Sequence, residues 1–192
     1  MSENPYDIFH SWLKEAESGS GMRNPNAMSL ATVGSDGKPS LRTVLLKAVN
    51  EEGFSFFTNY ESRKGRELDG NPHAALCFYW DKLARQVRVE GAVTRLPKEK
   101  SEAYFALRPR GSQLGAWASK QSREIPSREF LEEKMREAEA RFPDKVPIPP
   151  YWGGYLLKPT SIEFWIEQPS RLHDRFLFLR EGSGWKKVRL SP

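Results

Sequence analysis

The sequence predicts a mainly β fold with peripheral helices, an α+β protein whose strands form a closed or nearly closed antiparallel barrel. Several β-prone runs alternate with turns rich in Gly, Asn, Asp and Pro. Short helical segments separate several of these runs, which is typical of a barrel with helices on its outside. A length of 192 residues, without repeats or low-complexity segments, fits one domain spanning residues 1–192.

The composition narrows the function classes. The single cysteine excludes an intramolecular disulfide, and the three histidines are too scattered to indicate a metal site, so we expect a reducing compartment and no metal. No run approaches the ~20 apolar residues of a membrane span, and the N-terminus is acidic and amphipathic, which predicts a cytoplasmic protein. The net charge of +5 is interleaved with acids, so small phosphorylated ligands explain it as well as nucleic acid does.

The first half of the chain is expected to form two helices and a series of strands. Asn4-Pro5 precedes a helix over 6–17, which makes up most of an N-terminal helical segment, residues 1–20. Ser62 is a good N-cap for a short second helix, which ends at Asn71-Pro72. Strands are predicted over 27–33, 40–49, 54–58, 73–80 and 85–95, because turn residues separate these β-prone runs.

The second half combines two helices with a further group of strands. Helices are predicted over 97–107 and, as a solvated outer helix, over 127–141. Between them lies a Gly/Ser/Arg-rich segment, 108–122, whose donors suit an anion. Four prolines make residues 143–150 a fixed connector. Strands are expected over 152–158, 161–166, 174–180 and 185–190.

The segment 171–175 places Arg171, His173 and Arg175 at alternate positions. If it is extended, these side chains share one face of a strand. Such a face either forms a solvated edge strand that discourages aggregation or contacts a planar anion. The histidine, which titrates near neutrality, and the preceding aromatic pair Phe164-Trp165 favour the anion site.

Two other places combine positive charge with a candidate anion site. Arg63 and Lys64 lie in the first turn of the predicted short helix, where cations oppose the helix dipole unless an anion binds the free N–H groups. Arg42 and Lys47 are five residues apart and therefore point to opposite faces of a regular strand. Either a bulge re-aims one of these two cations or they contact two different ligands.

Five strings, in order along nearly the whole chain, resemble the pyridoxine/pyridoxamine 5′-phosphate oxidase family. They are RTVLLK at 42–47, FTNYESRKGRE at 57–67, RQVRVEG at 85–91, YFALRPRGSQLGAWASKQS at 104–122, and FW followed by SRLHDRFLF at 164–178. Each string alone is a weak signal, whereas five in register are specific. The resemblance implies an FMN-binding split β-barrel that forms a homodimer, with two sites between the subunits.

The resemblance also implies a ligand set, position by position. FMN would contact Arg42, Thr43, Val44, Leu45, Leu46, Lys47, Phe57, Thr58, Arg63, Lys64, Gln86, Gln121, Ser122, Trp165 and Arg175. The substrate, pyridoxine or pyridoxamine 5′-phosphate, would contact Lys47, Tyr104, Arg108, Ser112, Arg171, Leu172 and His173. No nucleic acid, membrane or metal is implied.

The implied reaction is oxidation of the exocyclic carbon that carries the alcohol or amine of the substrate. FMN takes a hydride from this carbon, pyridoxal 5′-phosphate forms, and O2 reoxidises the flavin with release of hydrogen peroxide. The implied catalytic residues are Arg171 and His173. Because a guanidinium stays protonated, Arg171 is expected to hold the substrate and stabilise negative charge, whereas His173 either orients the ring or shuttles a proton.

The chain departs from the family pattern at two places beside the flavin set. Ile166-Glu167 stands where Gln-Gly is expected, and Phe57 stands where Tyr is common. Two alternatives remain: a related split-barrel flavin oxidase with another substrate, of the phenazine-biosynthesis type, and a non-catalytic protein that binds flavin or pyridoxal phosphate. The intact segment 171–175 and the complete substrate set favour the oxidase of pyridoxine phosphate.

Overall fold

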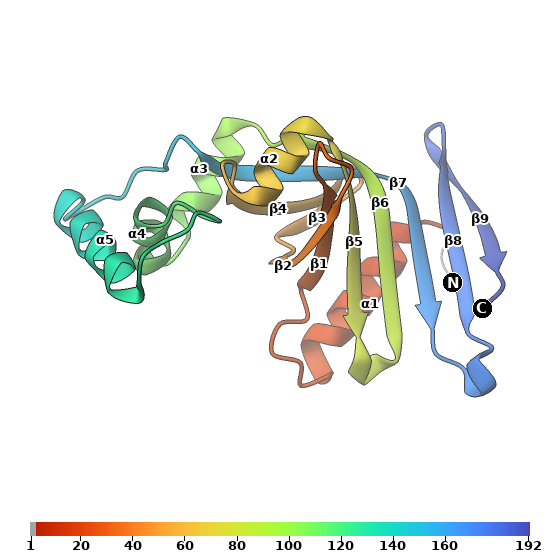
Figure 1. The fold of residues 1–192 in the computed structure, drawn as a ribbon. Coiled ribbons are helices and arrows are strands. Elements are labelled where there is room, and N and C mark those ends of the chain that lie inside the picture. The colour runs from red at the N-terminus through yellow and green to blue at the C-terminus, as the bar shows by residue number, and fades with distance from the viewer. Residues whose placement is uncertain (1–2) are drawn as a thin grey trace.

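The computed structural model describes residues 3–192, so residues 1 and 2 of the predicted N-terminal segment lie outside the described part (Figure 1). The helices are α1 (Pro5–Gly19), α2 (Arg63–Gly70), α3 (Lys98–Ala106), α4 (Arg110–Ala118) and α5 (Arg128–Arg141). The strands are β1 (Ala27–Val33), β2 (Pro39–Leu45), β3 (Ala48–Asn50), β4 (Gly53–Asn59), β5 (His73–Trp80), β6 (Arg85–Arg95), β7 (Trp152–Ile166), β8 (Asp174–Glu181) and β9 (Gly184–Leu190). None of the described helices is long and apolar enough to cross a bilayer.

Within residues 3–192, nine strands form one antiparallel sheet that curves into a half-barrel (Figure 1). The strand order is β2-β1-β5-β6-β7-β4-β3, with β8 beside β7 and β9 beside β8. The helices lie around this sheet. The predicted class, mainly β with peripheral helices, is therefore confirmed.

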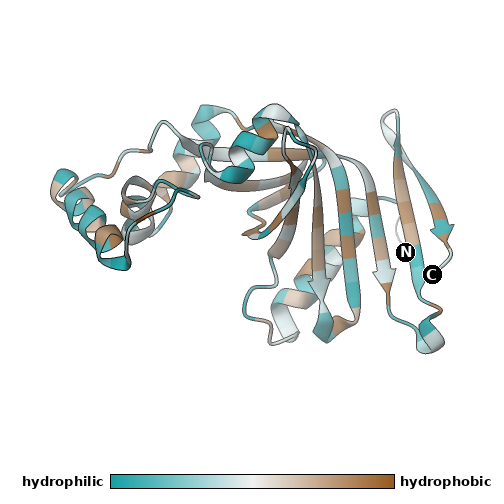
Figure 2. Cartoon of the chain, in the orientation of Figure 1, coloured by the Kyte–Doolittle hydropathy of each residue, from teal (hydrophilic) through white to brown (hydrophobic). Residues whose placement is uncertain are grey.

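Helix α1 packs against the sheet and fills its main core. Asn4 caps the helix, because its side chain accepts a hydrogen bond from the Tyr6 N–H at 2.9 Å. The buried Phe9 ring packs edge-on against Phe54 and Phe78, with centroids 4.9 and 5.0 Å away. Apolar and polar positions alternate along the strands (Figure 2), since every second side chain faces this core.

A second, smaller core joins α3, α4 and α5 into a helical unit beside the half-barrel (Figure 1). Phe105, Leu114 and Ala138 are buried there together with Trp152, the first residue of β7. Helix α4 is not among the predicted helices, because Gly and Ser lower the helix propensity of residues 110–118. Burial of Leu114 in the second core supplies the stabilisation that local propensity lacks.

Strand β7 connects the two cores. It is one strand of 15 residues, so the prediction of two strands at 152–158 and 161–166 was wrong. Its first half pairs with β4, its second half with β8, and β6 pairs with both halves. Pro159, which suggested a break, lies opposite Gly91 at a register shift, where the missing proline N–H is tolerated.

The close approach at this register shift requires glycine at position 91. A Cβ on Gly91 would lie 2.0 Å from the Lys158 carbonyl oxygen, which is backbone and cannot move aside without disrupting β7. We expect Gly91→Ala to lower the free energy of unfolding by about 2 kcal/mol or more, measured by urea denaturation. The control is Gly70→Ala, whose Cβ meets nothing within 4 Å and should change stability by at most ~0.5 kcal/mol. Equal stability of the two variants would contradict this account of β7.

Candidate active site

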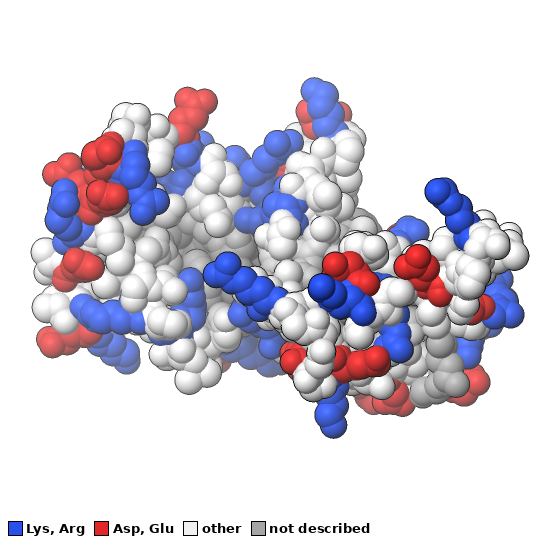
Figure 3. Space-filling model, turned by 90° about the horizontal axis from the view of Figure 1, so that it is seen from below, with Lys and Arg blue, Asp and Glu red and all other residues white. Residues whose placement is uncertain are grey.

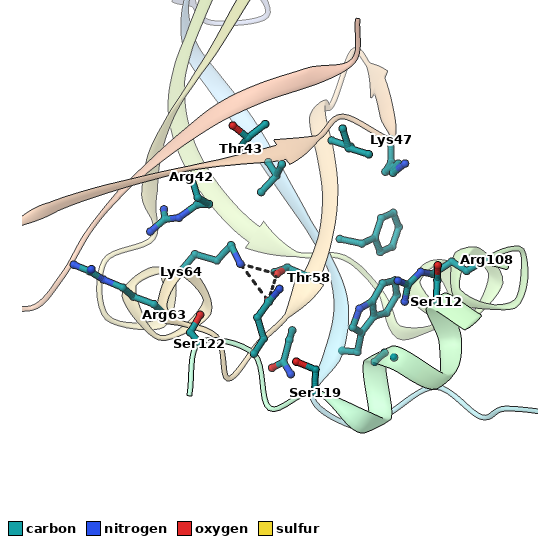
Figure 4. A pocket seen from close by; sticks show the side chains of 18 of the residues that line it. Arg42, Thr43, Lys47, Thr58, Arg63, Lys64, Arg108, Ser112, Ser119 and Ser122 are labelled. Atoms are coloured by element: carbon teal, nitrogen blue, oxygen red, sulfur yellow. Dashed lines mark hydrogen bonds between the residues drawn. The ribbon is translucent and has the colours of Figure 1, made fainter. Parts of the chain in front are cut away.

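An open pocket of about 1110 Å³ lies between β2, β4, α2 and α4. Seen from below, a hollow separates the helical unit from the sheet, and Lys and Arg side chains surround it (Figure 3). In the close view, Arg42, Arg63 and Lys64 lie on one side, whereas Lys47 and Arg108 lie on the other (Figure 4). The pocket therefore has two cationic ends.

The first end is built around the N-terminus of α2. As predicted, Ser62 caps this helix, with its Oγ accepting from the Gly65 N–H at 3.3 Å. The Lys64 Nζ donates to Thr58 Oγ1 at 3.1 Å and to Gln121 Oε1 at 3.2 Å (Figure 4). No carboxylate among residues 3–192 forms an ion pair with Lys64, although this side chain is buried.

Desolvation by burial, with the positive charge of Arg42 beside it, lowers the pKa of Lys64 to about 8, and Glu67 opposes this shift only in part. The protonated ammonium is therefore poorly solvated by the protein alone. A bound phosphate dianion would supply the missing negative charge, next to the free N–H groups of the helix start. This is the chemistry of a phosphate-binding site.

Arg42 and Lys47 both reach the pocket because the predicted strand 40–49 is divided. Pairing with β1 ends at Leu45, and the Lys47 N–H instead donates to the Ser55 carbonyl of β4 at 2.9 Å. Leu46, at the change of partner, turns into the main core and is 5% exposed. Of the two alternatives that the five-residue spacing left open, the bulge is not observed: the strand instead switches pairing partner between Leu45 and Lys47.

The second end of the pocket has an aromatic wall. The rings of Phe57 and Tyr104 stack with centroids 4.1 Å apart, and the nearly parallel ring of Trp152 lies 5.5 Å from Phe57 and 6.2 Å from Tyr104. The Arg108 guanidinium lies over Trp152, with its carbon 4.7 Å from the ring centroid. Phe57, which departs from the family pattern, is therefore one of three nearly parallel rings that form this wall.

Arg108 is the clearest unsatisfied group of the pocket. Its buried Nη1 has no hydrogen-bond partner within residues 3–192, and desolvation lowers the pKa of its guanidinium. A buried donor without an acceptor is costly, and a charged one more so. Together with Lys47 and Ser112, which also line this end, Arg108 suits a second anion.

The pocket brings together most of the predicted ligand residues but not all of them. It is lined by Arg42, Thr43, Val44, Leu45, Lys47, Phe57, Thr58, Arg63, Lys64, Tyr104, Arg108, Ser112, Gln121 and Ser122. Leu46 lies in the core instead. The remaining predicted residues, Gln86, Trp165, Arg171, Leu172, His173 and Arg175, do not line this pocket.

These remaining residues form a second group on β6, β7 and the segment that follows β7. Gln86, Trp165 and Arg175 are aligned across three neighbouring strands. The Arg175 Nε donates to the nearly buried carboxylate of Glu163 at 2.7 Å. The ring of His173 lies 4.6 Å from that of Trp165. In the strand order, β2 and β8 lie on opposite sides of β6, so the two groups occupy different parts of one chain.

The prediction that Arg171, His173 and Arg175 share one strand face was wrong. Pro169–Arg171 forms a short 3-10 turn, in which Ser170 and Arg171 have φ of 58° and 62°. Strand β8 begins only at Asp174, whose carboxylate accepts from Gln168 Nε2 at 2.9 Å. Alternation does not apply before Asp174, because this turn and its side-chain contact replace the strand.

Sequence reasoning missed Trp152 and Glu67. Trp152 lines the pocket and carries the aromatic stack, but a strand-start tryptophan has no local signal beyond burial. Glu67 accepts from Arg63 Nε at 2.9 Å and from Arg42 at 3.1 Å. Its spacing of four residues from Arg63 on α2 was the available signal.

The Lys64 environment predicts a titration near neutral pH. Folding lowers its pKa from 10.5 to about 8, so Lys64 is still mostly protonated at pH 7, but this proton lowers the stability of the folded chain, and the penalty is lost as pH rises from 8 towards 10.5. We expect lysine side-chain NMR to show one titration near pH 8 that is absent from Lys64→Met. Saturating inorganic phosphate should raise this pKa by about one unit. A Lys64 titration near 10.5 without phosphate would refute the buried, unpaired ammonium.

Known protein families match most of the chain in two parts. A family described as "Pyridoxamine 5'-phosphate oxidase" matches residues 15–142. One described as "Pyridoxine 5'-phosphate oxidase C-terminal dimerisation region" matches residues 152–192. The residues of the second group other than Gln86 lie within this region.

Similar proteins and structures agree with this match. A pyridoxine/pyridoxamine 5′-phosphate oxidase of Cupriavidus taiwanensis is 55% identical over 100% of this chain and 91% of its own length. One of Rubrobacter xylanophilus is 56% identical over 98% of this chain and 87% of its own length. PhzG from Burkholderia lata 383, in complex with tetrahydrophenazine-1-carboxylic acid, has a TM-score of 0.93 at 32% identity and covers 100% of this chain and 94% of its own.

A further structure shows the fold alone. A pyridoxamine 5′-phosphate oxidase-related, FMN-binding protein of Nostoc punctiforme has a TM-score of 0.79 at 20% identity, covering 100% of both chains. The half-barrel described above is thus the split barrel that the sequence predicts. The second matching region is described as the region through which the family dimerises. Because its fold, both matching regions and relatives above 50% identity agree, the chain belongs to the pyridoxine/pyridoxamine 5′-phosphate oxidase family.

Proposed function

We propose that this chain oxidises pyridoxine and pyridoxamine 5′-phosphate to pyridoxal 5′-phosphate, with FMN as cofactor and O2 as electron acceptor. The observation that carries the proposal is the pocket with two separate cationic ends, one at Lys64 and one at Arg108. Two phosphorylated ligands, bound side by side, would neutralise both ends. The predicted cytoplasmic location stays a prediction that rests on composition.

The first end fits the phosphate of FMN. Arg63, Lys64 and Arg42 supply positive charge, and α2 supplies a capped helix start. Thr58, Gln121 and Ser122 line the same end, and the β2 residues Thr43, Val44 and Leu45 border the pocket towards its other end. When bound there, FMN would supply hydride acceptance and reoxidation by O2, with release of hydrogen peroxide.

The second end fits the phosphate of the substrate. Arg108 has an unpartnered guanidinium nitrogen, and Lys47 and Ser112 add further donors. The ring centroid of Tyr104, which belongs to the aromatic wall, lies 5.8 Å from the Lys47 Nζ. These residues would hold the phosphate while the ring of the substrate lies towards the flavin, which positions the exocyclic carbon for hydride loss.

The second ligand group would complete the site from a second copy of the chain. Gln86, Trp165 and Arg175 lie at positions of β6, β7 and β8 that do not line the pocket of their own chain, and part of this group belongs to the dimerisation region. A twofold-symmetric dimer presents each group to the pocket of the other subunit. Two composite sites per dimer follow from this symmetry.

Arg171 and His173 have distinct roles in this arrangement. A guanidinium does not lose its proton, so Arg171 would hold the substrate and stabilise negative charge that develops during the reaction. The Nδ1 of His173 accepts from the Gln168 backbone N–H at 3.2 Å. A neutral His173 therefore carries its proton on Nε2, which makes it a donor that orients the substrate.

Both substrates lose two electrons in the reaction, but only the amine consumes a water molecule. The alcohol loses a hydride and a proton to give the aldehyde, and O2 becomes hydrogen peroxide. The amine first loses the same two electrons to give an imine, which water converts to the aldehyde and ammonia. Closing the pocket with the second subunit would shield the hydride step from solvent.

A phenazine-type oxidase is the second candidate, favoured by the likeness to PhzG at a TM-score of 0.93. It would share the flavin end of the pocket and differ at the substrate end. The ligand of that PhzG structure carries a carboxylic acid rather than a phosphate. Lys47, Arg108 and Ser112 offer more donors than one carboxylate needs, which supports the phosphorylated substrate.

The direct test is the visible spectrum of the purified protein with and without pyridoxine 5′-phosphate in the absence of air. We expect flavin bands that bleach on addition of the substrate and return, with hydrogen peroxide, when air is admitted. Flavin that stays oxidised with this substrate but bleaches with a reduced phenazine precursor would transfer the proposal to the second candidate. Protein that binds no FMN would refute both.

Replacement of Arg171 separates catalysis from cofactor binding. We expect Arg171→Ala to lower kcat about 100-fold or more, because the variant loses charge stabilisation at the reacting atoms, while FMN stays bound. Arg180→Ala is the matched control, since Arg180 is an exposed arginine of β8 that donates to the nearby Gly182 carbonyl oxygen at 3.1 Å and lies over the Trp185 ring. Equal turnover of the two variants would remove Arg171 from the site.

A further inference from the structure

Glu67 is a nearly buried carboxylate at the flavin-phosphate end that the proposed mechanism does not yet use. It lies on α2, is 9% exposed, and receives hydrogen bonds from strands β1 and β2 as well as from its own helix. Its Oε2 accepts from Thr32 of β1 at 2.5 Å and from Ser40 of β2 at 2.5 Å. It also accepts from Arg42 of β2 at 3.1 Å, and its Oε1 accepts from Arg63 at 2.9 Å.

These contacts keep Glu67 ionised. Burial raises the pKa of the carboxyl, but hydrogen bonds from Ser40, Thr32, Arg63 and Arg42 outweigh burial and hold the pKa at about 2. The carboxylate therefore carries its full negative charge at any pH at which the enzyme operates. It pairs two arginines that come from different elements of the fold.

We propose that Glu67 is a positioning residue that holds Arg42 and Arg63 ready for the phosphate of the flavin cofactor and sets the charge of that site. The inference rests on the proposed function, because it assumes that FMN binds at this end of the pocket. Glu67 itself does not touch the phosphate. It acts through the two arginines.

The two arginines differ in their remaining hydrogen-bonding capacity. The Nε of Arg63 donates to Glu67, and the two terminal nitrogens of Arg63 have no hydrogen-bond partner within residues 3–192. A guanidinium held in this way presents both terminal nitrogens to a phosphate in a bidentate contact. The terminal nitrogens of Arg42, in contrast, already donate to Leu30, Thr32, Ser40 and Glu67. Arg42 therefore contributes mainly charge, and Arg63 contributes geometry.

Glu67 also matches the charge of the site to its ligand. Arg42, Arg63 and Lys64 carry three positive charges, and the carboxylate leaves two. A phosphomonoester carries nearly two negative charges at neutral pH. The ionised site is thus nearly neutral with FMN bound, whereas riboflavin, which lacks the phosphate, would leave it unpaired.

The test compares FMN with riboflavin, because only FMN uses these groups. Dissociation constants are measured by quenching of flavin fluorescence on the full chain freed of flavin. We expect Glu67→Gln, which keeps the shape and removes the charge, to weaken FMN binding about tenfold or more while riboflavin binding changes by less than about twofold. The matched control is Glu61→Gln, the same change at an exposed position on the other side of the Ser62 cap, which should leave both constants unchanged.

Three outcomes would overturn the inference. Equal weakening of FMN and riboflavin would mean that Glu67 only supports the fold. Tighter FMN binding by Glu67→Gln would mean that the carboxylate competes with the phosphate. A wild-type chain without preference for FMN would instead refute the cofactor of the proposed function, and the inference with it.

A second variant keeps the test decisive if Glu67→Gln does not fold. Ser40→Ala removes one donor to the Glu67 Oε2 and one acceptor for Arg42, at a partly exposed position of β2. We expect a smaller loss of the preference for FMN over riboflavin, about threefold. An unchanged preference in the folded Ser40→Ala protein would also overturn the inference.

Discussion

Positive charge that the chain does not neutralise is the constraint on which this structure depends. Lys64 is buried with hydroxyl and amide partners only, and Arg108 has a buried nitrogen without an acceptor among residues 3–192. Both groups have a lowered pKa because burial removes water from the charged form. A folded protein tolerates such groups when a bound ligand supplies the missing charge, so the pocket sacrifices some stability of the free chain for the binding of anions.

The sheet provides the rigidity that this arrangement requires. Strand β7 passes through both cores, with Trp152 at one end in the aromatic stack and Trp165 at the other end in the second ligand group. In the proposed arrangement, the same strand therefore fixes both the substrate end of one pocket and the residues that contact the pocket of a second subunit. Because β6 pairs along both halves of β7, the spacing between these two groups is set by backbone hydrogen bonds.

The parts of the fold that depend on local sequence signals were predicted correctly, whereas those that depend on distant segments were not. Helix α1 and the start of α2 were predicted correctly, because caps at Asn4 and Ser62 act within a few residues. The change of strand partner at Leu46 and the continuity of β7 across Pro159 depend on distant segments, β4 and β6, that no local pattern contains. Arg171 was misplaced for a related reason, since a turn fixed by the contact between Gln168 and Asp174 replaced the strand. The ligand residues themselves were placed by resemblance, and the structure assembles most of them into one pocket.

Under the proposed arrangement, dimer formation and flavin binding are one linked equilibrium. Lys64 and Arg63 lie in one subunit, whereas Trp165 and Arg175 come from the other, so FMN bound between them stabilises the dimer by mass action. The linkage also acts in reverse, because a monomer lacks the part of the FMN site that Trp165 and Arg175 of the second subunit supply. Glu67 gains importance from this division. A monomer whose arginines are already held in place can bind the phosphate first, and the second subunit then closes over the ring of a flavin that is already anchored.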